Sequence, residues 1–554
     1  MVMMTGKEAL MELLRNEGVE YVFGMPGITE LLFMDGLENH PEMRYILGLH
    51  EVVSVGMAEG YARTSGKVGV VNLHTGPGVA ASMAMLYNAH RGGVPLVITA
   101  GQQDTRLLMH APHLSGELVR MTSQFTKWSA EVLYAADIPL AIQRAFKMAA
   151  QPPTGPVFVS LPQDVLTQSL DFEYIPSTPS FTRLRSDQET INRAAELLAK
   201  TQTPAIIVES GVAKNDALSE VVQLAELIGA RVYQPWMSDV NFPVSHPQYM
   251  GDLRTGDPHT IEILQPVDVL VVVGCQLFAE ERYLPQPLLA KNTKVIQIDD
   301  DPWEIAKNFP VAVGIQGNIK VSLAELTEVL QKSMSAQAHE AAKIRARDIA
   351  KEKGEITAAF LKKAQQEKDN VPISVSRLMQ ELKDSLKPGT LVVDDCWSSS
   401  PTLRRTIDFT EPHSFQRSRG GGSIGWGLPG ALGVKLASPD RPVVAVVGDG
   451  SAMWSIQSLW TAAHYNIPVT YIICANASYC MVKIGKALLM GEPAKERCLG
   501  VDLDEPIIDF CQLAQGMGVQ GQKVERPEKL REALKSALEA DKPSVVEVYI
   551  EKVA

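Results

Sequence analysis

The sequence predicts an α/β protein made of three domains, each a doubly wound parallel sheet. Short apolar runs rich in β-branched residues alternate with helical patterns, which is typical of buried parallel strands with helices on both faces. These runs end in glycine-rich or polar turns, as strands do where they lead into helices. At 554 residues the chain is too long for one hydrophobic core and has the length of three ordinary domains.

Composition and charge restrict the class of protein further. Hydrophobic residues make up 45% of the chain and charged residues 21%, as in soluble globular proteins. The net charge of −12 argues against nucleic acid or an anionic membrane as the main partner. Residues 1–18 have the pattern of an amphipathic helix rather than a signal peptide, and no apolar run approaches the ~20 residues of a membrane span. We therefore expect a cytoplasmic protein.

The six cysteines carry no recognisable framework. None of them forms a CxxC spacing, and several stand in apolar predicted strands. This pattern predicts reduced, mostly buried thiols, with neither disulfides nor a zinc site.

Residues 1–175 are predicted to form the first domain. Strand and helix patterns alternate here, and the glycine-rich turn His74-Thr75-Gly76-Pro77-Gly78 opens a helix of small residues. The predicted strands lie at 21–24, 43–49, 68–73, 96–100 and 157–161, and a further helix at 51–65.

Residues 185–335 are predicted to form a central α/β domain, followed by a helical linker at 336–370. The turn at 273–275 and the acidic run Asp299-Asp300-Asp301 resemble parts of nucleotide-binding sheets, but no GxGxxG motif accompanies them. We favour a supporting role for this domain, while FAD or another nucleotide stays open as a ligand. The linker is rich in Lys, Glu, Gln and Ala with charges of alternating sign, which predicts a solvated helix.

Residues 371–554 are predicted to form the third domain, which carries the most informative motif. The apolar run 442–447 predicts a strand that ends in Gly448-Asp449-Gly450-Ser451, with Ser451 suited to cap a helix at 456–465. The next predicted strand, 469–474, ends just before Asn476. Because neighbouring parallel strands end at the same sheet edge, we expect Asp449 and Asn476 to lie together there.

This pair predicts a site for a hard cation. A carboxylate, an amide oxygen and a backbone carbonyl form an incomplete oxygen shell of the kind that Mg²⁺ completes with water and phosphate oxygens. A helix N-terminus after Gly450 would add backbone donors for a diphosphate. The alternative is an ordinary strand-turn-helix with a solvent-facing aspartate.

The motif, with Asn476 placed 27 positions after Asp449, resembles the thiamine-diphosphate-binding motif of the thiamine-dependent decarboxylases and acetolactate synthases. The resemblance implies thiamine diphosphate and Mg²⁺ as cofactors and three domains of the thiamine-diphosphate enzyme type. It also implies that Asp449, Asn476 and the Ser478 carbonyl are the metal ligands. The remaining cofactor-binding residues implied by this motif are Gly448, Gly450, Ser451, Tyr479, Cys480 and Met481.

Glu51 is the second candidate. It follows a predicted strand and opens a run of Val, Met and Ala, so it is either a helix-capping acid or a buried carboxyl whose pKa is raised for use. The run resembles the segment that, in thiamine-diphosphate enzymes, presents a glutamate to N1′ of the aminopyrimidine. On that resemblance Glu51 is the cofactor-activating residue.

Other motifs extend the resemblance over nearly the full chain. The turn containing Pro26 resembles the N-terminal turn of the family. The segment Gly420–Pro429 resembles the one beneath the cofactor, which implies that Ile424 supports the bent cofactor and that the Gly422 carbonyl accepts from its 4′-amino group. Ser398 and Ser399 follow a predicted strand and are either diphosphate donors or helix caps.

Within the family, the motifs are most similar to those of the benzoylformate decarboxylases. His74 stands where those enzymes keep a catalytic histidine, although a lone histidine is more often a turn residue. Ile28 replaces a serine that binds the substrate carboxylate, and the second catalytic histidine has no match in the central domain. His110 and His113 lie where related enzymes place pocket groups, so either could take its place. Val482 belongs to a Met-Val pair that resembles acetolactate synthase.

The resemblance implies a function and an assembly. The first expectation is non-oxidative decarboxylation of a 2-oxo acid through a C2-carbanion/enamine, with His74 and His113 as the candidate acids. The alternatives are a carboligase or lyase of the acetolactate synthase type, acting on an acyl substrate, and a non-catalytic cofactor-binding protein. In the family the site forms between two subunits, which implies a homo-oligomer and favours a tetramer.

Overall fold

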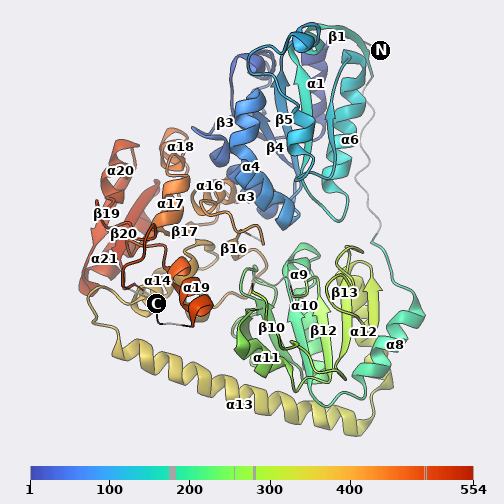
Figure 1. Cartoon of the computed structure of the whole chain (residues 1–554), viewed down its shortest axis with the longest axis vertical. Helices are drawn as coiled ribbons and strands as arrows, with labels where there is room; N and C mark the ends of the chain where they lie inside the picture. Colours follow the sequence, from blue (N-terminus) through green and yellow to red (C-terminus); the bar gives the residue numbers. More distant parts are fainter. Residues whose placement is uncertain are drawn as a thin grey trace.

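The computed structural model describes residues 2–173, 183–254, 256–278, 282–418, 420–491, 493 and 496–552. Three six-stranded parallel sheets, each covered by helices, confirm the predicted fold class (Figure 1). The exact domain boundaries stay a prediction, and the one at residue 175 lies outside the described residues. Within the described ranges no helix is long and apolar enough to cross a membrane.

The N-terminal domain has a sheet with β2 and β4 near its centre. Its strands, in spatial order, are β3 (Arg44–Leu47), β2 (Tyr21–Met25), β4 (Gly69–Leu73), β5 (Leu96–Gln102), β7 (Val157–Pro162) and β6 (Ser129–Glu131). Its helices are α1 (Gly6–Asn16), α2 (Leu31–Glu38), α3 (Glu51–Ser65), α4 (Thr75–Gly92), α5 (Leu118–Thr122), α6 (Ile138–Ala150) and α7 (Gln163–Thr167).

The start of the chain differs from the predicted helix. Residues Val2–Thr5 form β1, which pairs antiparallel with β8 (Ser169–Phe172). The helix begins only at Gly6, because the Thr5 hydroxyl and the Glu8 carboxylate form a capping box there. Pairing between the two ends of the domain therefore overrides the local helical pattern.

The C-terminal domain repeats the strand order of the N-terminal one. Its sheet runs β16 (Phe415–Arg417), β15 (Leu391–Asp395), β17 (Val443–Gly448), β18 (Thr470–Ala475), β20 (Ser544–Tyr549) and β19 (Gln520–Val524). Its helices are α14 (Val375–Ser385), α15 (Ser400–Thr406), α16 (Gly427–Ala437), α17 (Asp449–Trp454), α18 (Ser458–His464), α19 (Cys480–Met490), α20 (Phe510–Gly516) and α21 (Pro527–Glu539).

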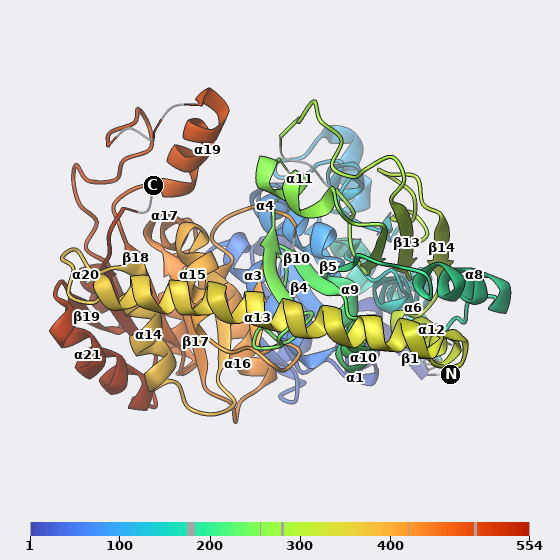
Figure 2. The same cartoon turned by 90° about the horizontal axis from the view of Figure 1, so that it is seen from below.

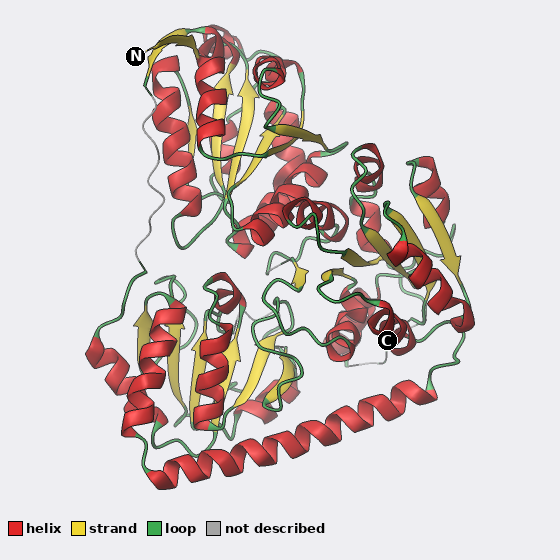
Figure 3. Cartoon of the chain, turned by 180° about the vertical axis from the view of Figure 1, so that it is seen from behind, coloured by secondary structure: helices red, strands yellow, loops and turns green. Residues whose placement is uncertain are grey.

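The central domain has a different strand order. Its sheet runs β11 (Tyr249–Leu253), β10 (Arg231–Pro235), β9 (Pro204–Val208), β12 (Val269–Val273), β13 (Lys294–Asp299) and β14 (Val313–Gln316). Its helices are α8 (Gln188–Leu198), α9 (Ser210–Lys214), α10 (Leu218–Ile228), α11 (Pro258–Leu264) and α12 (Ile319–Ser333). The 31-residue helix α13 (Ala336–Gln366) then runs along the outside of the molecule toward the C-terminal domain (Figures 2 and 3).

The N- and C-terminal domains share one hydrophobic core, because α3 packs directly on α16. The two helix backbones touch. A Cβ on Gly60 would lie 2.1 Å from the Gly430 carbonyl oxygen, and one on Gly433 would lie 1.9 Å from the Met57 carbonyl oxygen. Glycine is required at both crossings, and the contact holds the helix that begins at Glu51 rigidly against the C-terminal domain.

Candidate active site

The structure brings Asp449 and Asn476 together at the carboxyl edge of the C-terminal sheet. Asp449 follows β17, and its Oδ2 accepts the N–H groups of Asn476 at 2.9 Å and Ala477 at 2.6 Å. The amide oxygen of Asn476 accepts the N–H of Ser478 at 3.1 Å. The three predicted metal ligands therefore belong to one tightly hydrogen-bonded turn.

This turn fits a magnesium ion. Burial raises the pKa of Asp449 to about 6, although N–H groups such as that of Gly450 act in the opposite direction. The contacts that hold the carboxylate are backbone groups, and a divalent cation would supply the compensating charge. A Cβ on Gly450 would lie 2.2 Å from the ring of Tyr479, so glycine lets the two segments of the turn close on each other. The helix begins at Asp449 with Gly448 as its cap, not at the predicted Ser451, which is buried in the first turn.

Asp395 anchors the segment predicted to lie beneath the cofactor. Its Oδ2 accepts the N–H groups of Gly425 and Gly427, each at 3.0 Å, and its Oδ1 accepts Nε1–H of Trp397 at 2.8 Å. Burial raises the pKa of Asp395 to about 6. Sequence reasoning missed this residue, although an acid that ends an apolar strand is itself a signal.

The predicted cofactor contacts in this segment lie on a loop held by Asn88. Its amide donates to the Ser423 carbonyl at 2.9 Å and accepts the Ser423 N–H at 3.1 Å. Gly422 has a φ of +76°, which favours glycine, and Ile424 is half-buried beyond it. Asn88 was not predicted, because its role depends on a contact 335 residues away in the chain.

Ser398 and Ser399 form a short 3₁₀ turn after β15. The Ser399 hydroxyl is buried and has no hydrogen-bond partner among the described residues, whereas Ser398 is half-buried. Ser399 precedes α15 without capping it through its side chain. The hydroxyl is therefore not used as a helix cap and stays a candidate donor to a diphosphate.

Glu51 is the first residue of α3, but it does not cap the helix. The cap is His50, whose Nδ1 accepts the N–H of Val52 at 3.1 Å. The Glu51 side chain is 12% exposed and lies against the first turn of α4. A Cβ on Gly78 would stand 2.9 Å from the Glu51 Oε1, so glycine makes room for the carboxylate. The capping alternative for Glu51 is thereby weakened.

His74 precedes α4, one helical turn before Gly78, so it shares this corner with Glu51. Its Nδ1 lies 2.8 Å from a carboxylate oxygen of Glu30, a residue that the sequence analysis did not single out. The predicted turn around Pro26 leads into this corner, and the Ile28 side chain beyond it is 72% exposed.

The other two histidines are exposed on a nearby loop. His110 ends the 3₁₀ segment Thr105–His110, and the backbone carbonyl of His113 accepts from the Gln103 amide at 2.9 Å. The carbonyl of the following residue, Leu114, would lie 3.4 Å from a Cβ on Gly76, at the start of α4. The contacts described between this loop and the start of α4 are therefore made by the loop backbone, and not by the imidazole of His110 or His113.

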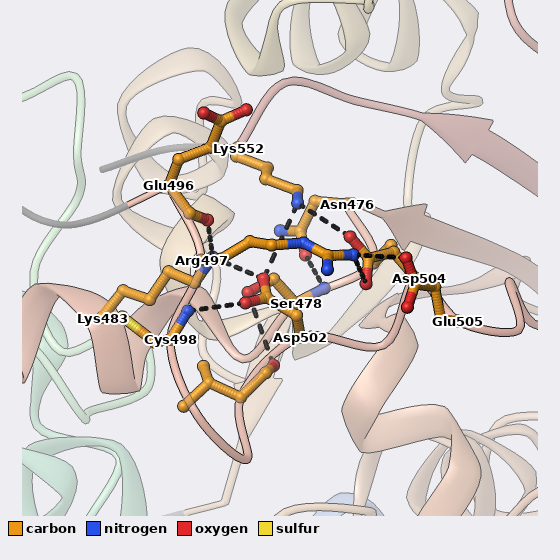
Figure 4. A network of polar contacts seen from close by, with 12 residues as sticks. Asn476, Ser478, Lys483, Glu496, Arg497, Cys498, Asp502, Asp504, Glu505 and Lys552 are labelled. Carbon is orange, nitrogen blue, oxygen red and sulfur yellow. Dashed lines mark hydrogen bonds and ion pairs between the residues drawn. The ribbon is translucent and has the colours of Figure 1, made fainter.

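The segment after the predicted metal-binding turn is fixed by an ion pair with a buried lysine (Figure 4). Cys480 and Met481 open α19, Val482 is 55% exposed, and Lys483 is buried. The Lys483 ammonium donates to Asp502 Oδ1 and to the Glu496 carbonyl, each at 2.5 Å, and this pairing lowers the pKa of Asp502. Figure 4 shows this network around Ser478.

The loop that carries Asp502 is hydrogen-bonded to the metal-binding turn. The N–H of Leu503 donates to the Ala477 carbonyl at 2.8 Å, and the N–H of Tyr479 donates to the Val501 carbonyl at 2.9 Å. Lys483 was not singled out in the sequence analysis. Its structural role depends on a partner that no local pattern identifies.

The matching edge of the central sheet is acidic. Glu209 follows β9 and accepts the N–H of Gln276 at 2.9 Å, while Asp299 ends β13. Burial, with the like charges of Asp300 and Asp301, raises the pKa of Asp299 to about 8. The carboxyl groups at this edge contrast with the backbone N–H groups at the corresponding edge of the C-terminal sheet.

Within one chain, the two halves of the predicted site lie apart along α4. Glu51 contacts Gly78 in the first turn of this helix, whereas the loop of Gly422 is held by Asn88, ten positions later. At 1.5 Å per residue this separation is about 15 Å. Glu51 and the Gly422 loop of the same chain therefore contact α4 at points about 15 Å apart.

The three α/β domains, with the same order of strands in the first and third, are those of a thiamine-diphosphate enzyme. Residues 4–121 match the thiamine pyrophosphate enzyme N-terminal TPP binding domain, residues 191–326 the central domain and residues 398–548 the C-terminal TPP binding domain. The chain belongs to the thiamine pyrophosphate enzyme family.

Individual relatives include both decarboxylases and acetolactate synthases. Benzoylformate decarboxylase of Pseudomonas aeruginosa is 32% identical over 99% of each chain. The acetolactate synthase large subunit of Haemophilus influenzae is 31% identical over 96% of this chain and 92% of its own. The solved thiamine diphosphate-dependent 4-hydroxybenzoylformate decarboxylase of Rhodococcus jostii RHA1 superposes with a TM-score of 0.86 at 30% identity, covering 99% of this chain and 100% of that one.

Proposed function

We propose that the protein catalyses the non-oxidative decarboxylation of a 2-oxo acid, using thiamine diphosphate and Mg²⁺. The observation that carries the proposal is that two candidate proton-transfer groups lie at the start of α4. His74 immediately precedes this helix, and the Glu51 carboxylate packs against Gly78 in its first turn. A decarboxylase needs one group to activate the cofactor and another to deliver a proton, and the start of α4 supplies both types.

The C-terminal edge would hold the cofactor. Asp449, the Asn476 amide oxygen and the Ser478 carbonyl would bind Mg²⁺, and the backbone donors after Gly448 would hold the diphosphate. Ser399, whose hydroxyl is buried and without a partner among the described residues, would donate to the same group. When bound, thiamine diphosphate supplies an electron sink for a carbanion next to a former carbonyl.

The N-terminal edge would move protons. The Glu51 carboxyl would exchange a proton with N1′ of the aminopyrimidine, and the His74 imidazole would deliver one to the carbon that has lost CO₂. A positioned acid of this kind contributes roughly 10²–10⁴-fold to a rate. His113, on the loop over α4, would be the second candidate acid, with His110 and Ile28 beside it in the substrate pocket.

The second candidate function is carboligation of an acyl unit, as the name acetolactate synthase describes for a relative of this chain. Two observations favour it: the pocket position 28 holds isoleucine rather than a polar group for a carboxylate, and the exposed Val482 follows Met481 at the start of α19. A non-catalytic cofactor-binding role is disfavoured, because binding alone does not require Glu51. FAD stays outside the proposal, because no GxGxxG motif accompanies the central sheet.

A homo-oligomer would complete the site. The separation of about 15 Å between Glu51 and the Gly422 loop along α4 means that a second copy must bring its own C-terminal edge to Glu51. Exposed apolar side chains on both edges support such an interface, among them Ile28, Leu31, Trp454, Val482 and Leu499. We propose a dimer as the minimal active unit and a tetramer as the assembly.

Product analysis tests the proposed reaction. Purified holoenzyme would be incubated with a panel of 2-oxo acids, with and without an added aldehyde, and CO₂, aldehyde and 2-hydroxy ketone would be measured. We expect aldehyde and CO₂ in equal amounts. Ligated products alone would favour the carboligase. If the cofactor exchanged its C2–H but no 2-oxo acid were turned over, the cofactor would be activated and the substrate would belong to another class of compound.

A further inference from the structure

We infer that Glu30 is a positioning residue that fixes the ring and the proton of His74. The inference rests on the proposed function, in which His74 delivers a proton. Glu30 ends the 3₁₀ turn Ile28–Glu30, and its side chain is 0% exposed while that of His74 is 20% exposed. A carboxylate buried so fully is costly unless its oxygens are hydrogen-bonded.

Both oxygens of Glu30 are occupied by donors from three strand ends. Oε1 accepts the Gly101 N–H at 2.8 Å and the Thr29 hydroxyl at 2.8 Å. Oε2 accepts the Gly27 N–H at 2.9 Å and lies 2.8 Å from Nδ1 of His74. The backbone donors come from the ends of β2 and β5, and His74 stands at the end of β4. The carboxylate therefore lies at the edge where these three neighbouring strands end.

The network assigns the proton on the imidazole. Backbone N–H groups can only donate, so both oxygens of Glu30 act as acceptors toward Gly27 and Gly101. The Thr29 hydroxyl uses its one proton on Glu30, so its oxygen can only accept from His74 Nδ1, which lies 3.1 Å away. Both neighbours of Nδ1 are therefore acceptors, and Nδ1 carries a hydrogen. In the neutral ring Nε2 is then the free acceptor, and any additional proton is held there.

Steric contact fixes the ring from a second direction. A Cβ on Gly27 would lie 2.1 Å from Nδ1 of His74, so the imidazole packs directly on the backbone of the turn after β2. The ring is thus held between this backbone and the Glu30–Thr29 pair. Nε2, the other ring nitrogen, is then the atom at which a proton can reach a substrate. A buried carboxylate behind Nδ1 also stabilises the positive charge when Nε2 is protonated, as in carboxylate–histidine pairs generally.

The decisive variant is Glu30→Gln, with Glu38→Gln on the exposed face of α2 as the matched control. The glutamine keeps the size of the side chain but replaces one acceptor oxygen with an NH₂ donor, which cannot accept from Nδ1–H. We expect aldehyde release to fall by up to roughly 10²–10⁴-fold, the contribution of a positioned acid, because an amide no longer fixes the tautomer of the imidazole. Cofactor affinity and C2–H exchange should stay at parental values, because the Asp449 turn is proposed to serve the first and Glu51 the second.

Two readouts separate positioning from general stability. If Glu30 acts through His74, the double variant Glu30→Gln/His74→Ala should be no slower than His74→Ala alone. In addition, ¹⁵N NMR of histidine-labelled parent protein should show His74 protonated at Nδ1 when neutral, and Glu30→Gln should shift this signal. Additive losses in the double variant, or a parental His74 protonated only at Nε2, would overturn the inference.

Failure of the proposed function has a different signature. If the parent protein supports C2–H exchange of the cofactor but releases no aldehyde from any 2-oxo acid, the decarboxylase proposal is wrong. The NMR assignment of the His74 proton is unaffected by that result. An active parent whose aldehyde release is unchanged by Glu30→Gln removes the positioning role alone.

Discussion

The N- and C-terminal domains have the same strand order but opposite chemistry at their sheet edges. In both, the strands lie in the order second, first, third, fourth, sixth and fifth, counted along the sheet-forming strands of each domain. The N-terminal edge presents titratable side chains, namely Glu30, Glu51 and His74. The C-terminal edge presents backbone N–H groups and the oxygens of Asp449 and Asn476. One topology therefore carries titratable side chains at the sheet edge of one domain, and backbone donors with carboxylate and amide oxygens at the edge of the other.

The central domain has a sheet edge of the same kind, but the acids described there belong to neither of the two arrangements. Its order, third, second, first, fourth, fifth and sixth, places β9 and β12 at the switch point where open α/β sheets bind ligands. Glu209 and Asp299 lie at this edge, and Asp299 is held with a raised pKa by burial. All three sheets are parallel and six-stranded, but the side chains at their edges differ, and it is these side chains that decide what an edge can bind.

The largest effect is expected from Asp449→Ala, which removes the only charged ligand proposed for Mg²⁺. Thiamine diphosphate binding, measured by calorimetry with excess Mg²⁺, should be lost, while the circular dichroism spectrum stays parental. Asp440→Ala, at an exposed position before β17, is the matched control and should bind normally. Unchanged cofactor affinity in Asp449→Ala would show that the C-terminal edge is not the charge-binding one.

The N-terminal edge is tested by Glu51→Gln. This change keeps the shape beside Gly78 but removes the exchangeable carboxyl proton, so the cofactor should still bind while C2–H exchange slows by orders of magnitude. Exchange is followed by proton NMR after acid quench in deuterated water. Parental exchange rates in this variant would reduce Glu51 to a structural acid and end the proposed division between the two edges.

A smaller effect should follow from crowding the metal-binding turn without changing its ligands. In Gly450→Ala the new methyl group would collide with the Tyr479 ring, since a Cβ would lie 2.2 Å from it. The turn must then open, and we expect cofactor affinity to fall about tenfold, the equivalent of ~1.4 kcal/mol. Gly354→Ala in α13, where a Cβ meets nothing within 4 Å, controls for the substitution itself. Equal affinity in the two variants would mean that the turn tolerates the displacement.

The sequence predicted the parts of the site that follow from strand ends and failed where long-range contacts decide. Asp449 and Asn476 meet because neighbouring parallel strands end at one edge, and the predicted helix at 51–65 has the bounds of α3. The helix after β17 was predicted to be capped by Ser451, but the backbone turns helical two residues earlier, at Asp449. The Asp449 carboxylate bonds across to the next strand end and fixes this early start.

Residues that act only through distant partners were missed for a common physical reason. Asn88 meets Ser423 across 335 positions, and Asp395 binds backbone N–H groups about 30 positions away. Glu30 lies in a short turn whose local sequence predicts nothing about His74, 44 positions later. Hydrophobic periodicity and turn chemistry describe neighbours in the chain, whereas these contacts depend on how sheets and helices are stacked.

The predicted effect on stability concerns the central edge and its dependence on pH. Burial raises the pKa of Asp299 to about 8, against 3.8 for the ordinary side chain, so between these values the folded state holds a proton that the unfolded state has released. Because stability falls with rising pH wherever the folded state binds more protons, this residue should destabilise the domain increasingly from about pH 4 to about pH 8. Asp299→Asn keeps an acceptor for the Asp301 N–H, which donates to Oδ1 at 2.9 Å, and removes the titration.

We therefore expect Asp299→Asn to be more stable than the parent by several kcal/mol at pH 8, a gain that shrinks to roughly 1–2 kcal/mol at pH 5, at about 1.4 kcal/mol per pKa unit. Asp348→Asn, at an exposed position on α13, is the control and should shift neither value. Thermal unfolding between pH 5 and pH 9 measures both. A variant that loses stability at pH 8 would show that the Asp299 charge is compensated by a bound cation, and that the central edge is a binding edge like the other two.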